Sequence, residues 1–124
     1  MELADADIII AGHAGIPFSR AMADKIWHNA GAIGMPANGG TSRVWCSLII
    51  PEADGLRLEH RAMSYDHAAA TAKMRRAGLA DGYADCLTSG LWPSLDVLPA
   101  TGAANTGILL AEKAFVWRPA SVGA

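Results

Sequence analysis

The regular alternation of residues 43–63 constrains the fold more than any other feature of this sequence. In residues 43–50, Val44, Cys46, Leu48 and Ile50 lie on one face, and Arg43, Trp45, Ser47 and Ile49 lie on the other. After the segment 51–55, in which Asp54-Gly55 supplies a tight turn, residues 56–63 alternate again. A period of two indicates strands, and the short connection indicates antiparallel pairing. The sequence therefore predicts a β-hairpin with one face in water.

Shorter strands are predicted on the N-terminal side of this hairpin. Residues 7–11 form a β-branched run that indicates a buried strand, and this strand ends at Gly12-His13. The loop that follows turns at Pro17, residues 20–24 read as a turn, and residues 25–29 read as the next strand. The glycine density of residues 31–40 excludes regular structure there and favours tight turns or a close approach of the backbone.

Two helices are predicted after the hairpin. Asp66 is suited to cap a helix over residues 67–77, and Gly78 is suited to end it. A second, shorter helix covers residues 81–89 and ends at Gly90. Residues 100–107 are typical of a linker, whereas the apolar tail 108–117 fits either a helix or a strand.

Length and composition fit one globular domain and exclude several functional classes. The chain has 124 residues, of which 52% are hydrophobic and 18% charged, although much of the apolar share is alanine, which buries little area. The net charge is −2, and the densest basic cluster, residues 73–76, fits a solvated helix face better than a nucleic-acid site. No apolar run approaches the roughly 18 residues of a membrane span, and the acidic N-terminus differs from a signal peptide. We therefore expect a cytoplasmic protein in which Cys46 and Cys86 are reduced thiols.

Several local patterns occur together in an order that resembles the C-terminal portion of the calcineurin-like metallophosphoesterases. These are Gly12-His13-Ala14-Gly15, the loop 29–34 with the sequence Asn-Ala-Gly-Ala-Ile-Gly, the hairpin, and Tyr65-Asp66 before an alanine-rich helix. The resemblance covers residues 5–98. It implies an α/β (α+β) fold, namely the C-terminal part of a two-sheet sandwich with short strands, a β-hairpin and following helices. Residues 1–98 would then form a partial phosphoesterase domain, and residues 99–124 a linker and apolar tail of unknown role.

The resemblance also implies a site in which two divalent metal ions, Mn, Fe or Zn, activate a water that attacks a phosphate ester. His13 matches the first histidine of the family's Gly-His-x-His motif and is the candidate metal ligand, whereas Gly15 stands in place of the second. The family's earlier Asp and His motifs do not occur in this sequence. One imidazole does not hold a catalytic metal, so we expect the isolated chain to be inactive as a phosphoesterase.

Two functions from different classes follow. In the first, the chain is a truncated or split metal-dependent phosphoesterase, and a complementing N-terminal chain supplies the other ligands for hydrolysis of phosphate mono- or diesters. In the second, the chain is a non-catalytic binding or structural module that self-associates or docks on a partner through an exposed sheet face. His13 would then only form hydrogen bonds within its loop, and this structural role is favoured for it. The sequence does not give the substrate.

The other polar candidates are assigned structural roles. His28 is expected to pack in the core or a loop, and His60 and His67 to face solvent or to cap an element. No two histidines are spaced by two or four residues, so the spacing predicts no metal-binding pair. The loop 31–40 is expected to support the histidine strand rather than to hold a phosphate. The pattern of a nucleophile with a neighbouring base is absent around Ser19, Ser42 and Ser47.

Overall fold

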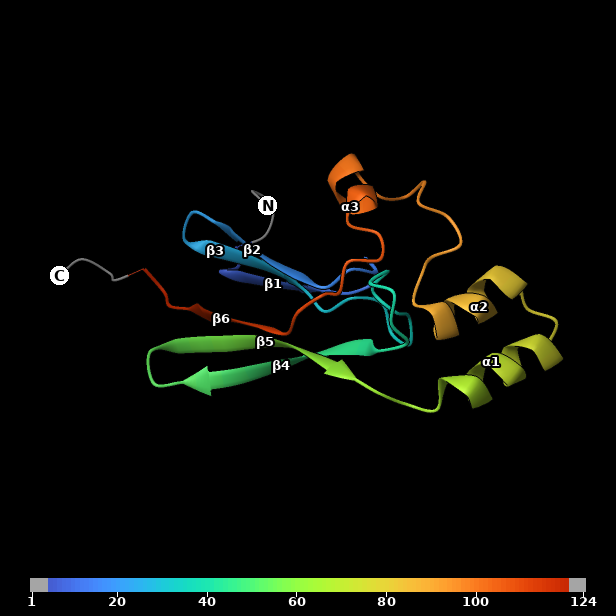
Figure 1. Cartoon of the computed structure of the whole chain (residues 1–124). Coiled ribbons are helices and arrows are strands. Elements are labelled where there is room, and N and C mark those ends of the chain that lie inside the picture. Colours follow the sequence, from blue (N-terminus) through green and yellow to red (C-terminus); the bar gives the residue numbers. More distant parts are fainter. Residues whose placement is uncertain (1–4, 121–124) are drawn as a thin grey trace.

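The computed structural model describes residues 5–120, and strands and helices follow one another there in an α+β order. The strands are β1 (Ile8–Ala11), β2 (Phe18–Met22), β3 (Lys25–Asn29), β4 (Val44–Glu52), β5 (Gly55–Met63) and β6 (Lys113–Trp117). The helices are α1 (His67–Arg76), α2 (Asp81–Ser89) and α3 (Ala100–Ala104). The mixed class expected from the sequence is confirmed. Figure 1 shows two small sheets in layers, with α1 and α2 beyond one end of them.

The first sheet, called here the N-terminal sheet, has the strand order β1-β3-β2. β1 runs parallel to β3 and β2 runs antiparallel to it, which confirms the strands predicted over residues 7–11 and 25–29. The predicted burial of the first strand is wrong, because β1 is an outer strand whose residues are half-buried or exposed. The turn predicted over residues 20–24 is wrong, because residues 18–22 pair with β3 and only Ala23-Asp24 form the turn. Sequence reasoning misses β2 because none of its residues is fully buried, and tertiary pairing overrides a weak local propensity.

The second sheet, called here the hairpin sheet, has the order β4-β5-β6. The predicted hairpin is confirmed, with Glu52 opposite Gly55 and the turn at Ala53-Asp54, one residue earlier than expected. β6 pairs antiparallel with β5, so the apolar tail contains a strand rather than a helix. Within the segment expected to be a linker, residues 100–104 form the short helix α3. The edge of β5 decides the conformation of the tail, because it offers backbone hydrogen bonds that no local pattern reports.

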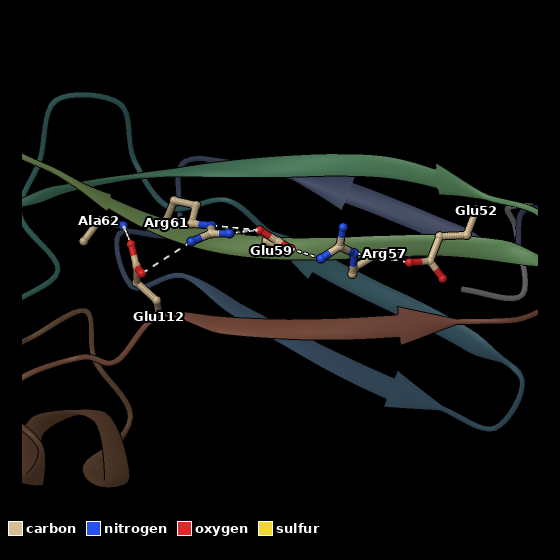
Figure 2. A network of polar contacts seen from close by, with 6 residues as sticks. All are labelled: Glu52, Arg57, Glu59, Arg61, Ala62 and Glu112. Carbon is tan, nitrogen blue, oxygen red and sulfur yellow. Dashed lines mark hydrogen bonds and ion pairs between the residues drawn. The ribbon is translucent and has the colours of Figure 1, made fainter.

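The outward face of β5 carries alternating charges that form a network with neighbouring carboxylates (Figure 2). Glu59 lies between Arg57 and Arg61, with oxygen–nitrogen distances of 2.6 Å to Arg57 Nη1 and 2.5 Å to Arg61 Nη2. The Glu59 side chain is only 4% exposed, because the two guanidinium groups cover it. Glu112 pairs with Arg61 at 3.7 Å and accepts a hydrogen bond from the Ala62 backbone N–H. The segment that enters β6 is thereby fixed to the end of β5.

The predicted helices begin and end at their capping residues. The Asp66 carboxylate accepts a hydrogen bond of 3.0 Å from the Ala69 N–H, which caps α1. Gly78 and Gly90 follow α1 and α2 in left-handed conformations, with φ of 69° and 70°. The two helices pack on each other, and the buried Thr71 hydroxyl donates to the carbonyl of Ala84 in α2.

The core lies between the two sheets. Ile26 of β3 and Leu58 of β5 are each 1% exposed, and Trp45 of β4 is 8% exposed. Burial of side chains of this kind contributes roughly 1.5–3 kcal/mol each. Cys46 and Cys86 are free thiols, as the sequence predicts. No helix within residues 5–120 has the length and apolar character needed to cross a membrane.

Candidate functional site

The loop between β1 and β2 presents the candidate metal ligand His13. β1 ends at Ala11, and His13 takes a left-handed conformation with φ of 73° and is exposed. The buried Asn29 at the end of β3 holds this loop, because its amide nitrogen donates to the carbonyls of Ala14 and Ile16 at 2.8 and 2.9 Å. Parallel pairing brings the ends of β1 and β3 to the same edge of the sheet. His13 therefore lies on a tethered loop at the kind of edge where ligand-binding groups commonly collect.

Gly15, which stands where the resembling family has its second histidine, lies against the indole of Trp92. A Cβ atom at this position would overlap the Trp92 ring, so no side chain fits unless the indole moves. Two hydrogen bonds hold Trp92, one from its backbone N–H to Asn38 Oδ1 at 2.9 Å and one from Nε1 to the Pro36 carbonyl at 2.7 Å. The space of a second ligand is therefore filled by packing.

The described residues do not by themselves fit a two-metal centre. No group of three or more His, Cys, Asp or Glu side chains comes together within residues 5–120. A catalytic metal site of the zinc type uses about three protein ligands, and His13 is the one matched position here. His13 alone therefore supplies no hydrolytic centre.

His13 lies at the edge of a wide cleft of about 1030 Å³. The cleft is bounded by the His13 loop, by residues 92–102, which connect α2 to α3 and include the start of α3, and by residues 108–113, which lead into β6 and include its first residue. Its lining is mostly apolar, and it contains five large side chains that are strongly exposed, namely Phe18, Tyr83, Val97, Ile108 and Leu109. The cleft therefore exposes more apolar side chain to solvent than the sheets do around the core.

A second polar cluster, called here the histidine cluster, lies between the two sheets and consists of His28, His60, Ser19 and Ser47. His28 of β3 and His60 of β5 are stacked, with ring centroids 4.5 Å apart and an angle of 10° between the rings. His28 Nδ1 shares a hydrogen bond of 2.7 Å with Ser19 Oγ on β2, and its Nε2 shares one of 2.8 Å with Ser47 Oγ on β4. His60 Nε2 donates to the Asn29 carbonyl at 3.0 Å. The cluster therefore links both sheets through the core.

Burial favours the neutral form of both imidazoles. Removal from water lowers the pKa of His28, and a charge on His60 lowers it further. Burial also lowers the pKa of His60; the hydrogen bond to the Asn29 carbonyl partly offsets this, and the Lys113 ammonium adds to the lowering. Because a carbonyl oxygen only accepts, neutral His60 carries its proton on Nε2. His28 can adopt either tautomer, since a serine hydroxyl both donates and accepts.

The structure confirms the expected burial of His28, contradicts the expected exposure of His60, and brings two serines to a histidine that is distant in sequence. His28 is fully buried, as predicted, but His60, expected at the surface, is 6% exposed because sheet stacking places it over His28. Ser19 and Ser47, for which the sequence offers no neighbouring base, both contact His28. The strand register could have indicated these contacts, because it puts Ser19 opposite His28 and Ser47 opposite His60. The second pairing follows from the predicted hairpin, whereas the contact between the histidines depends on how the sheets stack.

The glycine-rich segment 31–40 acts as a structural junction. Its residue Asn38 is 2% exposed and has a φ of 56°. The Asn38 Oδ1 accepts from the Trp92 N–H, its Nδ2 donates to Thr106 Oγ1 at 3.0 Å, and its carbonyl accepts from the Gly107 N–H at 2.9 Å. The segment therefore supports the loops that follow α2 and α3.

Neither a protein-family model, nor a curated protein, nor a solved structure matches this chain. The functional conclusions therefore depend on the residues and the geometry given above.

Proposed function

We propose that residues 5–98 are part of a domain of the calcineurin-like metallophosphoesterase type, and that His13 is one metal ligand of a hydrolytic site completed by another polypeptide segment. The substrate is a phosphate mono- or diester, and the metal is Mn, Fe or Zn, as the resemblance implies. The chain by itself is inactive, because one imidazole does not hold a catalytic metal. The site of action is the cytoplasm.

The free edge of β1 carries this proposal. Within residues 5–120, β1 is an outer strand that pairs with β3 alone, and the two strands are parallel. Parallel strands are normally covered on both faces, yet Ile10 of β1 is 56% exposed. A further strand alongside β1 would cover this edge and bring its own polar groups to the end of the sheet where His13 lies.

The geometry of the His13 loop supports the same role. An exposed imidazole on a loop tethered by Asn29 is available to a metal, and the loop adjoins the wide cleft. The packing of Trp92 on Gly15 means that the second metal would take its ligand from outside this loop. The proposed site therefore differs from the family pattern in one ligand.

A non-catalytic binding module is the second candidate, and the apolar lining of the cleft favours it. Side chains such as Val97, 82% exposed, and Ile108, 60% exposed, are typical of an interface. In this function the chain self-associates or binds a partner protein without metal, and His13→Ala leaves the association unchanged.

The first experiment measures metal binding and hydrolysis by the chain as it stands. Isothermal titration with Mn²⁺ and hydrolysis of bis(4-nitrophenyl) phosphate should both be negligible for this chain and for its His13→Ala variant. Robust turnover that disappears in His13→Ala would overturn the claim that the site is incomplete.

The second experiment tests for the completing segment. The DNA directly upstream of the Met1 codon should encode the family's Asp-x-His and Gly-Asn-His motifs, and co-expression of that segment should give Mn²⁺-dependent hydrolysis that His13→Ala abolishes. If the co-expressed segment gives no metal-dependent hydrolysis, or if the upstream DNA encodes nothing related, the binding-module function is favoured.

A further inference from the structure

A small cavity adjoins the histidine cluster between β2 and the strands β5 and β6. Its volume is about 170 Å³, and three polar side chains line it, namely Ser19, His60 and Lys113. The rest of its lining is apolar, and no aspartate or glutamate lines it. This volume is well above the roughly 10–15 Å³ that a single water needs on the same measure, so the cavity accommodates a small polyatomic anion.

Lys113 supplies a positive charge at this cavity. It is the direct cross-strand partner of His60 in the antiparallel β5–β6 pair, so both side chains lie on the same face of the hairpin sheet. The ion pairs formed within residues 5–120 do not include Lys113. Its charge at the cavity is therefore not neutralised by a carboxylate there.

His60 supplies an acceptor at the same cavity. Its Nε2 is used by the Asn29 carbonyl, whereas its Nδ1 has no hydrogen-bond partner within residues 5–120. The Nδ1 atom is not fully buried. Because His60 lines this cavity, the atom is accessible to a molecule inside it. This nitrogen is therefore free to accept a hydrogen bond from a ligand in the cavity.

Ser19 supplies a donor. Its Oγ lies 2.7 Å from His28 Nδ1, and Ser47 Oγ satisfies the opposite ring nitrogen. When His28 carries its proton on Nδ1, the Ser19 oxygen accepts from it and the Ser19 hydroxyl proton is free to point elsewhere. Ser47 then donates to His28 Nε2, so the whole chain of hydrogen bonds remains satisfied.

We propose that this cavity is a binding site for a phosphate group in its hydrogen phosphate form. The P–OH donates to His60 Nδ1, and the anionic oxygens accept from Lys113 Nζ and the Ser19 hydroxyl. Phosphate fits this site because it combines a negative charge with a hydrogen-bond donor, whereas the carboxylate and sulfate forms present at neutral pH lack the donor. The site needs neither a metal ion nor His13, and it goes beyond the proposed hydrolytic function.

The test is calorimetric titration of the full chain with inorganic phosphate near neutral pH, in the presence of EDTA so that no metal contributes. We expect saturable binding, about tenfold weaker in Lys113→Met and about threefold weaker in Ser19→Ala. Lys73→Met, which removes an exposed charge from α1, is the matched control and should bind like the unmodified chain. Sulfate should bind several-fold more weakly than phosphate. A parallel titration with phenyl phosphate shows whether the occupant is a free anion or a phosphate monoester.

Nuclear magnetic resonance locates the contact. Phosphate should shift the imidazole Nδ1 resonance of His60 and leave that of His67 unchanged. No saturation at phosphate concentrations up to about 50 mM, equal affinity in Lys113→Met, or an unshifted His60 resonance would each overturn the proposal, because a site of even millimolar affinity would saturate. Unchanged urea unfolding of each variant shows that any loss of binding is local.

Discussion

Acidification below pH 6.5 should destabilise the protein through the histidine cluster. The imidazoles of His28 and His60 titrate near 6.5 in the unfolded chain, whereas burial lowers the pKa of both in the folded chain. In the window below 6.5 the unfolded chain therefore binds more protons, and the free energy of unfolding falls as the pH falls. Each histidine contributes a slope of up to about 1.4 kcal/mol per pH unit, and the two together contribute up to about 2.8 kcal/mol per pH unit. Above pH 6.5 this stabilisation is fully present.

Urea unfolding followed by tryptophan fluorescence between about pH 5 and pH 8 measures this slope, and most carboxylates remain ionised over that range. His28→Gln removes one titrating group, so the slope should fall, and one remaining histidine contributes at most about 1.4 kcal/mol per pH unit. His13→Asn is the control, because it removes an exposed histidine and keeps a residue that tolerates positive φ. Its slope should equal that of the unmodified chain.

Two results would refute the reasoning. A free energy of unfolding that is constant between about pH 5 and pH 6.5 would mean that both imidazoles accept protons in the folded state without penalty. An unchanged slope in His28→Gln would mean that the protons bind elsewhere in the chain. In either case the stacked rings would not be the source of the pH dependence.

Glycine substitutions test the packing of the loops. Gly78 and Gly90 have φ of 69° and 70°, so alanine should cost about 1–2 kcal/mol of backbone strain at each position. Gly90 also abuts the Thr41 backbone, whereas Gly78 faces open space. In urea unfolding, Gly90→Ala should therefore lower the free energy of unfolding by roughly 2 kcal/mol more than Gly78→Ala does. Equal losses in the two variants would contradict this. Gly15→His should lower the free energy of unfolding by about 1–3 kcal/mol, because its side chain meets Trp92. A gain in Mn²⁺ affinity on calorimetric titration of this variant, without such a loss, would contradict the packing argument.

Features that depend on a few neighbouring residues could be predicted from the sequence. The alternation of residues 43–63 predicts the β4–β5 hairpin, and the capping residue Asp66 with Gly78 and Gly90 predicts where α1 begins and where both helices end. Side-chain periodicity and turn chemistry act over four or five residues, so they can be read locally. The Gly-His loop also lies at the end of β1, as its place after a β-branched run predicts.

Features that depend on pairing between distant segments could not be predicted in this way. β2 has no fully buried residue to mark it, and β6 could be a helix or a strand until its pairing with the edge of β5 is known. The candidate site shows the same limit. Sequence spacing brings no two histidines together, although His28 and His60 are stacked in the core.

The sequence alone therefore determined the hairpin, the two longer helices and a histidine loop that resembles one phosphoesterase motif. The tertiary structure alone decided that Trp92 fills the space beside Gly15, that β1 pairs with β3 alone among residues 5–120, and that His28 and His60 meet between the sheets. The physical reason is the separation along the chain between the residues that interact. Periodicity and capping are satisfied by nearest neighbours, whereas sheet stacking and edge pairing join residues whose separation along the chain carries no local signal.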